Sequence, residues 1–465
     1  MVKKVHKMEN INVGQGLSDH DDPYEAGKTA AEEAMEDYTG EEKPDIGFVF
    51  CSGTKYGTDR KNAESFSEGV QEVLDEIHWI GCNSAGEISR DGFKQGTAVV
   101  TLIGSDMVYW GSNVEKIDSE NPEKTGEKGA EKALDNMNID RMVHSYSQYQ
   151  FLKEADTSQM ISSDPYNMLV IANGPDVENK GFDVPIKLLK GIKKVVSSNP
   201  IIGGLSSHES AEQSYQFFNG EVYENALITV SIVTTLKTSF RLANGYQTTS
   251  KAVLTTETDG SVVGKFNGED AAQKYAELIE KDFSDLLPKS QKIAKKLNLE
   301  KGLLKMMKAA GKNPVKENPL TKIASRNPLG FVDKSGDVWI KMPVDIKDGK
   351  KLQFMNDVPK NSALQVLKFD IDSVYKTSTD AIEELKEEIN NRGFIFAFEC
   401  YQRLNLFEEK LEDISEEYTL GGDIIPLGFA TMGEFGTTKE GVSGGQAITL
   451  TTMGISDKAL TDSGK

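Results

Sequence analysis

The segment HWIGCNSAGEIS, from His78 to Ser89, joins a short apolar run to small residues and a single glutamate. Two more segments repeat this pattern: NPIIGGLSSHES from Asn199 and DIIPLGFATMGEFG from Asp423. In all three, a glycine is followed three residues later by a hydroxyl residue and six residues later by a glutamate. The aligned positions are Gly81, Gly203 and Gly428, then Ser84, Ser206 and Thr431, then Glu87, Glu209 and Glu434. This recurrence indicates an internal repeat.

The surroundings of the three segments repeat as well. An apolar run rich in β-branched and aromatic residues precedes each segment, starting at Gly47, Asn167 and Gly393, and predicts a buried strand. Each copy then has room for one amphipathic helix before the segment and shows a strand-like run after it. The repeated unit is therefore strand, helix, short strand, turn and strand. It predicts an α/β fold of mixed sheets flanked by helices.

The spacing of the copies predicts how the chain divides into domains. Gly81 and Gly203 are 122 residues apart, whereas Gly203 and Gly428 are 225 apart. The first two copies are therefore expected to be related halves of one domain, residues 1–250, and the third to belong to a second domain, residues 251–465.

Two features mark the second domain. A hairpin signal at Asp259-Gly260 lies near its start. The lysine-rich segment 289–319 predicts a helical insertion within it, and a basic docking site for an acidic partner is the alternative.

Composition restricts the classes of partner. The chain has 73 acidic and 53 basic residues and a net charge of -20, which would repel phosphate backbones and anionic lipid surfaces. We expect no nucleic-acid partner.

The basic N-terminus is not followed by an apolar signal segment, and no run of about 18 apolar residues occurs, so we expect no membrane insertion and a cytoplasmic location. The three cysteines form no CxxC pair and the five histidines are scattered, so neither disulfides nor a metal site is indicated.

Two side chains are candidate nucleophiles for an enzyme. Ser84 lies in CNSAG, where Cys82 replaces the first glycine of the G-x-S-x-G nucleophile elbow. Cys400 ends an apolar strand and precedes Arg403, whose charge would lower the pKa of a neighbouring thiol, although a packed core thiol is the alternative. The glycine-rich segments lack the lysine of a phosphate loop. The sequence therefore favours a protein without catalysis or cofactor, with a hydrolase or transferase that uses Cys400 or Ser84 as the alternative.

With these motifs the chain resembles the FIST family, a sensory module of prokaryotic signal-transduction proteins with an N-type part followed by a C-type part. The resemblance is carried by IGCNSAGEIS and TAVVTLI in the first part. In the second part it is carried by AAQKYAELI, NPLGFVDKSGDVWIKM, FECYQRL and GFATMGEFG. It implies a cytoplasmic protein that binds a small polar ligand, with amino acids as the suggested class. Because no output module is visible in the chain, a separate signalling protein is an expected partner.

Two positions depart from the family pattern. Lys341 stands where the family usually has an arginine, and Gln446 stands where it usually has an asparagine. Lysine in place of arginine forfeits bidentate recognition of a carboxylate, so the ligand is expected to differ from that of typical relatives.

We predict the ligand site in the third copy. Arg403 and Glu434 are expected at the same end of one sheet, where a cation and an anion would suit the two poles of a zwitterion. Gly433 would let the backbone approach a ligand closely. The predicted ligand contacts are Arg403, Glu434, Gly433, Thr431, Cys400 and Lys341, with Ser84, Glu87, Ser206 and Glu209 as secondary candidates.

Two alternatives to this site stay open. The spacing Ser84-x-x-Glu87, like Thr431-x-x-Glu434, also fits a capping box at the start of a helix. Because the first two copies lack a matching arginine, Glu87 and Glu209 are expected to be mainly structural. The other alternative is an interaction scaffold that binds no ligand.

Overall fold

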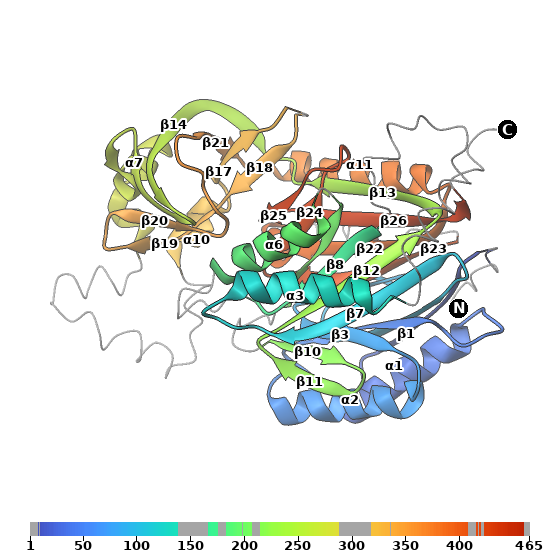
Figure 1. The fold of residues 1–465 in the computed structure, drawn as a ribbon. Coiled ribbons are helices and arrows are strands. Elements are labelled where there is room, and N and C mark those ends of the chain that lie inside the picture. The colour runs from blue at the N-terminus through green and yellow to red at the C-terminus, as the bar shows by residue number, and fades with distance from the viewer. Residues whose placement is uncertain are drawn as a thin grey trace.

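The computed structural model describes residues 8, 10–137, 166–174, 183–197, 199–206, 214–287, 318–334, 336–407, 415–416, 418–419 and 423–459. These residues form three units with the same order of elements, together with one inserted β domain (Figure 1). The first unit contains β1 (Asn12–Ser18), α1 (Pro23–Asp37), β2 (Ile46–Ser52), α2 (Arg60–Leu74), β3 (Trp79–Ser84), β4 (Glu87–Ser89), β5 (Gly92–Lys94) and β6 (Ala98–Gly104).

The second and third units repeat this order. The second contains β7 (Val108–Lys116), α3 (Pro122–Asp135), β8 (Tyr166–Ala172), α6 (Asp183–Val196), β9 (Ile201–Leu205), β10 (Tyr215–Phe218), β11 (Glu221–Glu224) and β12 (Ala226–Thr234). The third contains β13 (Leu236–Ala243), α11 (Ile371–Glu388), β22 (Arg392–Cys400), α12 (Tyr401–Leu406), β23 (Asp423–Thr431), β24 (Glu434–Thr437), β25 (Ser443–Gln446) and β26 (Leu450–Ala459).

Each unit contributes to a six-stranded sheet with one common topology. The strand orders are β1-β6-β2-β3-β10-β11, β7-β12-β8-β9-β24-β25 and β13-β26-β22-β23-β4-β5. The central pairs β2/β3, β8/β9 and β22/β23 are parallel, and the other neighbours are antiparallel. The predicted α/β class with mixed sheets is confirmed, and the first two copies share one strand order.

The hairpin that follows each small-residue turn leaves its own unit. β4 pairs with β23, β10 pairs with β3, and β24 pairs with β9. The hairpin of the first unit thus extends the sheet of the third unit. The hairpin of the third unit extends the sheet of the second, and that of the second extends the sheet of the first. Strands from both sides of the predicted boundary at residue 250 therefore share sheets.

Helices cover the outer face of each sheet, as the apolar periodicity of the repeats predicts. α1 and α2 cover the first sheet, α3 and α6 the second, and α11 the third (Figure 1). Aspartates begin three of these helices: Asp22, Asp59 and Asp370 each accept a backbone N–H from the first turn.

The inner faces of the three sheets meet in one hydrophobic cluster, to which Phe48, Ile171 and Phe396 each contribute from a different unit. The rings of Phe48 and Phe396 lie edge to face with their centroids 5.1 Å apart. The three units therefore share a single core.

The inserted β domain, residues 247–368, lies between β13 and α11 of the third unit. It contains β14 (Gln247–Asp259), β15 (Val262–Phe266), β16 (Glu269–Asp270), α7 (Ala271–Leu278), a 3-10 helix (Phe283–Leu286), α10 (Pro319–Ala324), β17 (Leu329–Val332), β18 (Val338–Lys341), β19 (Pro343–Lys347), β20 (Lys351–Phe354) and β21 (Ala363–Lys368). The predicted hairpin at Asp259-Gly260 joins β14 to β15. The predicted helical insertion 289–319 lies outside the described residues, apart from its last two.

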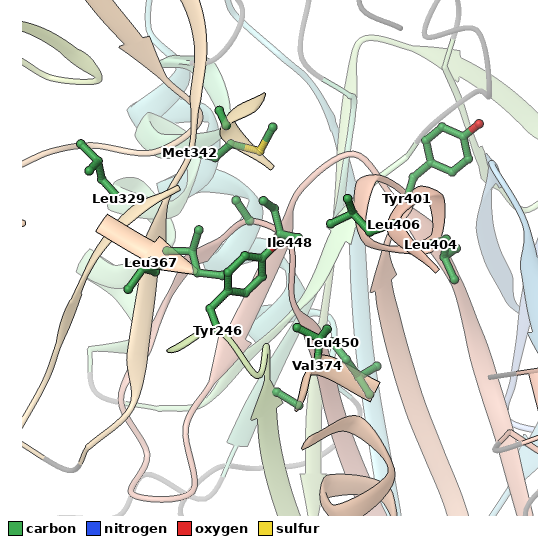
Figure 2. Close-up of a cluster of buried hydrophobic side chains, with 14 of the residues drawn as sticks. Tyr246, Leu329, Met342, Leu367, Val374, Tyr401, Leu404, Leu406, Ile448 and Leu450 are labelled. Atoms are coloured by element: carbon green, nitrogen blue, oxygen red, sulfur yellow. The ribbon is translucent and has the colours of Figure 1, made fainter. Parts of the chain in front are cut away.

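The two ends of the insertion meet, since Ser373 Oγ donates to the carbonyl of Gly245 over 3.0 Å. Figure 2 shows the hydrophobic cluster at this junction, which includes Leu329 and Leu367 of the inserted domain and Ile448 and Leu450 of the third unit. Among the described helices, none is both long and apolar enough to cross a membrane.

Candidate functional site

The repeated hydroxyl and glutamate meet at equivalent places in the first and third units. Ser84 Oγ lies 2.6 Å from Glu87 Oε1, and Thr97 Oγ1 lies 2.7 Å from Glu87 Oε2. In the third unit, Thr431 Oγ1 lies 2.6 Å from Glu434 Oε1, and Thr449 Oγ1 lies 2.9 Å from Glu434 Oε2. The Glu87 carboxyl thus links the end of β3 to the residue before β6. The Glu434 carboxyl likewise links the end of β23 to the residue before β26.

The second unit uses Gln216 in place of a glutamate. Glu87 and Glu434 pair across strands with the residue after a repeat glycine, and Gln216 does the same with Cys82. Its Nε2 donates to Ser206 Oγ over 2.7 Å, and its Oε1 accepts from the N–H of Ala226 over 3.0 Å.

Gln216 was not recognised in the sequence, because the three repeats were compared at a constant distance of six residues after the glycine. The chain between β9 and β10 is longer than the chain between β3 and β4, which moves the counterpart along the sequence. Glu209, the predicted counterpart, lies outside the described residues.

The capping-box interpretation is wrong for both described copies. Glu87 and Glu434 begin strands β4 and β24 rather than the first turn of a helix. Their carboxyls bond to hydroxyl groups across the turn, which fixes the direction in which each hairpin leaves its unit.

The expected pairing of Arg403 with Glu434 does not form. Arg403 Nη1 donates to both carboxylate oxygens of Glu399, over 2.6 and 2.8 Å, and Tyr418 donates to the same carboxylate over 2.8 Å. The chain turns into α12 directly after Cys400, so Arg403 folds back onto the residue four positions before it. Arg403 is fully buried and its charge is compensated within this cluster.

Two other predicted contacts also lie away from open space. Thr431 and Cys400 are buried and paired across β22 and β23. Burial raises the pKa of the Cys400 thiol well above its usual value, which disfavours a reactive thiolate. Neither side chain lines the cavity described next.

A cavity of about 320 Å³ lies between α6, the exchanged β24–β25 hairpin and the inserted β domain. It brings together three of the predicted contacts: Lys341, Gly433 and Glu434. The hairpin packs closely on the inserted domain, because a Cβ at Gly444 would lie 2.3 Å from the Trp339 ring. The lining consists of Pro185, Ile186, Leu189, Lys190, Lys193, Leu205, Phe331, Trp339, Lys341, Met355, Asn356, Asp357, Pro359, Met432, Gly433, Glu434, Phe435 and 443–446.

Three buried polar side chains in this lining have at least one polar atom that forms no hydrogen bond or ion pair with the described residues. Gln446 is 1% exposed, and neither its Oε1 nor its Nε2 has a hydrogen-bond partner among the described residues. The Nδ2 of Asn356 is in the same state. Lys341 is 8% exposed and forms no ion pair within the described part of the chain; its Nζ lies 5.8 Å from the centroid of the Phe331 ring. Buried polar groups are normally satisfied, so these side chains leave hydrogen-bonding capacity unused at the cavity wall.

Burial controls the charges around the cavity. It lowers the pKa of Lys341 to about 8 and raises that of Glu434 to about 8, which favours the protonated form of the Glu434 carboxyl. Burial also lowers the pKa of Lys193, which donates to the carbonyl of Ser443. Lys190 forms an ion pair of 2.8 Å with Asp357.

Asn356 and the α6 side of the cavity had no signal in the sequence. Gln446 was visible only as a departure from the usual family residue. An isolated polar residue in a glycine-rich segment looks like any turn residue until the fold buries it.

Family profiles match most of the chain. The profile of the FIST N domain matches residues 45–269, and that of the FIST C domain matches residues 301–437. The chain belongs to the FIST family. FIST domains are sensory domains of signal-transduction proteins. Lys341, Gly433 and Glu434 lie in the matched part of the FIST C domain, whereas Gln446 lies beyond it.

Two other proteins are similar to parts of this FIST protein. An uncharacterized protein of Methanocaldococcus jannaschii is 24% identical over 361 residues, which cover 77% of this chain and 61% of that relative. This chain therefore spans less than two thirds of the relative's length. A solved structure of cyanuric acid hydrolase from A. caulinodans matches 48% of this chain and 71% of its own, with 8% identity and a TM-score of 0.27. That likeness is too weak to carry an inference about activity.

Proposed function

We propose that this FIST protein is a sensor that binds a small polar metabolite in the cavity between α6, the β24–β25 hairpin and the inserted β domain. The observation that carries the proposal is the Gln446 side chain, which is buried at the cavity wall with both polar atoms unpartnered. Such a group costs about 1–3 kcal/mol of stability unless a ligand or water satisfies it. A volume of about 320 Å³ lies at the lower end of the range for small-molecule sites.

The positions of the two candidate nucleophiles are consistent with a protein that binds a ligand without catalysis. Ser84 and Cys400 are both buried, and neither lines the cavity. The resemblance to the family makes amino acids the first class to test, and a separate signalling protein would read the ligand-bound state. A cytoplasmic location goes with this proposal.

The first experiment replaces Gln446 with methionine, which has a similar shape but no amide. We expect Gln446→Met to raise the free energy of unfolding of the ligand-free protein by about 1–2 kcal/mol, because an unpaired buried amide is removed. We expect the same change to abolish stabilisation by ligands, which is observed as a rise in melting temperature. For the parent, this stabilisation reaches about 2.7 kcal/mol at a hundredfold excess of ligand over the dissociation constant. A metabolite library that includes the amino acids supplies the ligands.

The matched control is Gln15→Met in the first unit. The Gln15 amide donates to Thr101 and to the carbonyl of Pro426, and it accepts from the N–H of Arg90. This variant should lose stability and keep the ligand response. The proposal fails if no library member stabilises the parent, or if Gln446→Met binds the hits as tightly as the parent does.

A further inference from the structure

The lysines around the cavity outnumber the ionised carboxylates. Lys190 is compensated by Asp357, with which it forms an ion pair at the partly exposed rim. Lys193 and Lys341 also line the cavity, and neither forms an ion pair within the residues that the structure describes. In a chain with a net charge of -20, this makes the cavity a local positive site.

The remaining carboxyl of the lining, Glu434, does not offset this charge. Its Oε1 lies 2.6 Å from Thr431 Oγ1, and its Oε2 lies 2.9 Å from Thr449 Oγ1. Its counterpart in the second unit is an amide: Gln216 donates to Ser206 Oγ, which lies 3.0 Å from the carbonyl of Ala172. In the third unit, Thr431 Oγ1 likewise lies 3.4 Å from the carbonyl of Glu399. A neutral Glu434 can therefore donate to Thr431 just as Gln216 donates to Ser206.

A ligand in this cavity meets cations, amides and apolar walls. The Lys341 ammonium supplies a point charge, and the amides of Gln446 and Asn356 supply donors. Trp339, Met355 and Leu189 supply apolar surface. The carboxyls among the described lining residues are Asp357, which pairs with Lys190, and Glu434, whose pKa is raised by burial. Neither is well suited to bind the ammonium group of an amino acid.

We propose that the cavity selects an organic carboxylate with an apolar body, whose carboxylate binds Lys341 and the neighbouring amides, in preference to a zwitterion of the same size. This inference deepens the proposed function and rests on it. The site then requires an anion, whereas the sequence predicted a zwitterion.

Matched triads of small molecules test this selection by titration calorimetry at pH 7. One triad is 4-methylpentanoate, leucine and 3-methylbutylamine. The other is 3-phenylpropionate, phenylalanine and 2-phenylethylamine. We expect at least one acid to bind, at least tenfold more tightly than the amino acid with the same side chain, and we expect no binding by the amines.

The outcomes separate the inference from the proposed function. If an amino acid or amine binds more tightly than its acid, or if the metabolite library yields only neutral or cationic ligands, the selection for anions is wrong and the sensor function stands. If no small molecule binds at all, both are overturned.

Lys341→Met tests the residue that is assigned to the carboxylate. We expect it to weaken binding of the best acid at least tenfold. We expect no loss of stability, because the change removes a buried ammonium that forms no ion pair within the described residues. Lys128→Met is the control, since Lys128 lies on the surface beside Glu115. An unchanged affinity in Lys341→Met, or an equal loss in Lys128→Met, contradicts the assignment.

The pH dependence gives a second readout. Affinity of the parent for the acid should fall as the pH rises through about 8, because Lys341 then loses its proton. The other titratable groups facing the cavity are Lys190 and Lys193 on α6, Asp357 after β20, and Glu434 on β24. A slope that remains in Lys341→Met would come from ionisation of Glu434 or Lys193, and the part due to Glu434 should vanish when Glu434→Gln is added. A parent affinity that is flat from pH 6 to 9 contradicts the role of Lys341.

Discussion

At the scale of single residues, Glu87, Gln216 and Glu434 occupy one structural position in three units. All three side chains tie the end of one strand to the start of another, and one of them is an amide. The internal repeat therefore shows that this position does not require a charge. It also changes the interpretation of Glu434, which the sequence predicted as the anionic pole of a ligand site.

Glu434→Gln should be tolerated by the fold. Burial raises the pKa of Glu434 from 4.5 to about 8, so the folded state favours the protonated form. The contribution of this group to stability is then full below about pH 4.5 and is lost as the pH rises toward 8, with a slope of up to about 1.4 kcal/mol per pH unit. We expect the parent to lose stability relative to Glu434→Gln over this interval.

Chemical denaturation at several pH values measures this difference. Gln216→Glu is the reciprocal control, because it places an ionisable group in the position that is naturally neutral and should introduce a similar pH dependence. A pH-independent difference between the parent and Glu434→Gln would mean that Glu434 is ionised in the folded protein.

At the scale of elements, the repeat glycines mark where a parallel neighbour approaches. A Cβ at Gly81, Gly203 or Gly428 would lie 1.7–1.9 Å from a backbone carbonyl oxygen of the adjacent strand. The contacts are with Val49, Val170 and Ala397, which are their register partners. The same glycines aligned the repeats in the sequence, so the signal that revealed the repeat has a direct steric cause.

Gly428→Ala should therefore be severe. The new Cβ would lie 1.7 Å from the carbonyl oxygen of Ala397, and the residue has a φ of +155°. We expect a loss of at least about 3 kcal/mol, more than the strain of an unusual backbone conformation alone. Gly441→Ala is the control, because its φ of +85° is also positive but its Cβ would meet nothing within 4 Å. Equal destabilisation of the two variants, measured by urea denaturation, would refute the steric account.

At the scale of the whole molecule, exchange of hairpins makes the three units depend on one another. In residues 1–250, β4 and β5 lack their partner β23, and β9 lacks β24. The inner cluster also loses the side chains that the third unit supplies, such as Phe396 and Phe429.

A fragment of residues 1–250 should not unfold cooperatively on its own, because it exposes both open sheet edges and an apolar face. Near-ultraviolet circular dichroism and thermal melting measure this. Co-expression with residues 251–465 is the control and should yield a complex of the two fragments that melts cooperatively. A cooperative transition in the isolated fragment would show that the predicted first domain is autonomous.

Local patterns in the sequence determined the elements of this protein. The apolar runs at Gly47, Asn167 and Gly393 predicted β2, β8 and β22, since burial on both faces leaves a continuous apolar signal. Glycine spacing revealed the repeat, and the family resemblance followed from the same segments. These features are set by neighbouring residues, so they can be read without knowledge of the fold.

Only the tertiary structure decided which distant residues meet. It placed Gln216 at the position of the repeat glutamate and paired Arg403 with Glu399. It also placed the hairpin of each unit in the sheet of another unit. It also built a cavity from α6, β25 and the inserted domain. Within the described chain, the Gln446 amide is buried there without a hydrogen-bond partner, and Lys341 is buried there without an ion pair. The physical reason is that strand pairing and burial are interactions between segments far apart in the chain. Their partners leave no periodic signature in the local sequence.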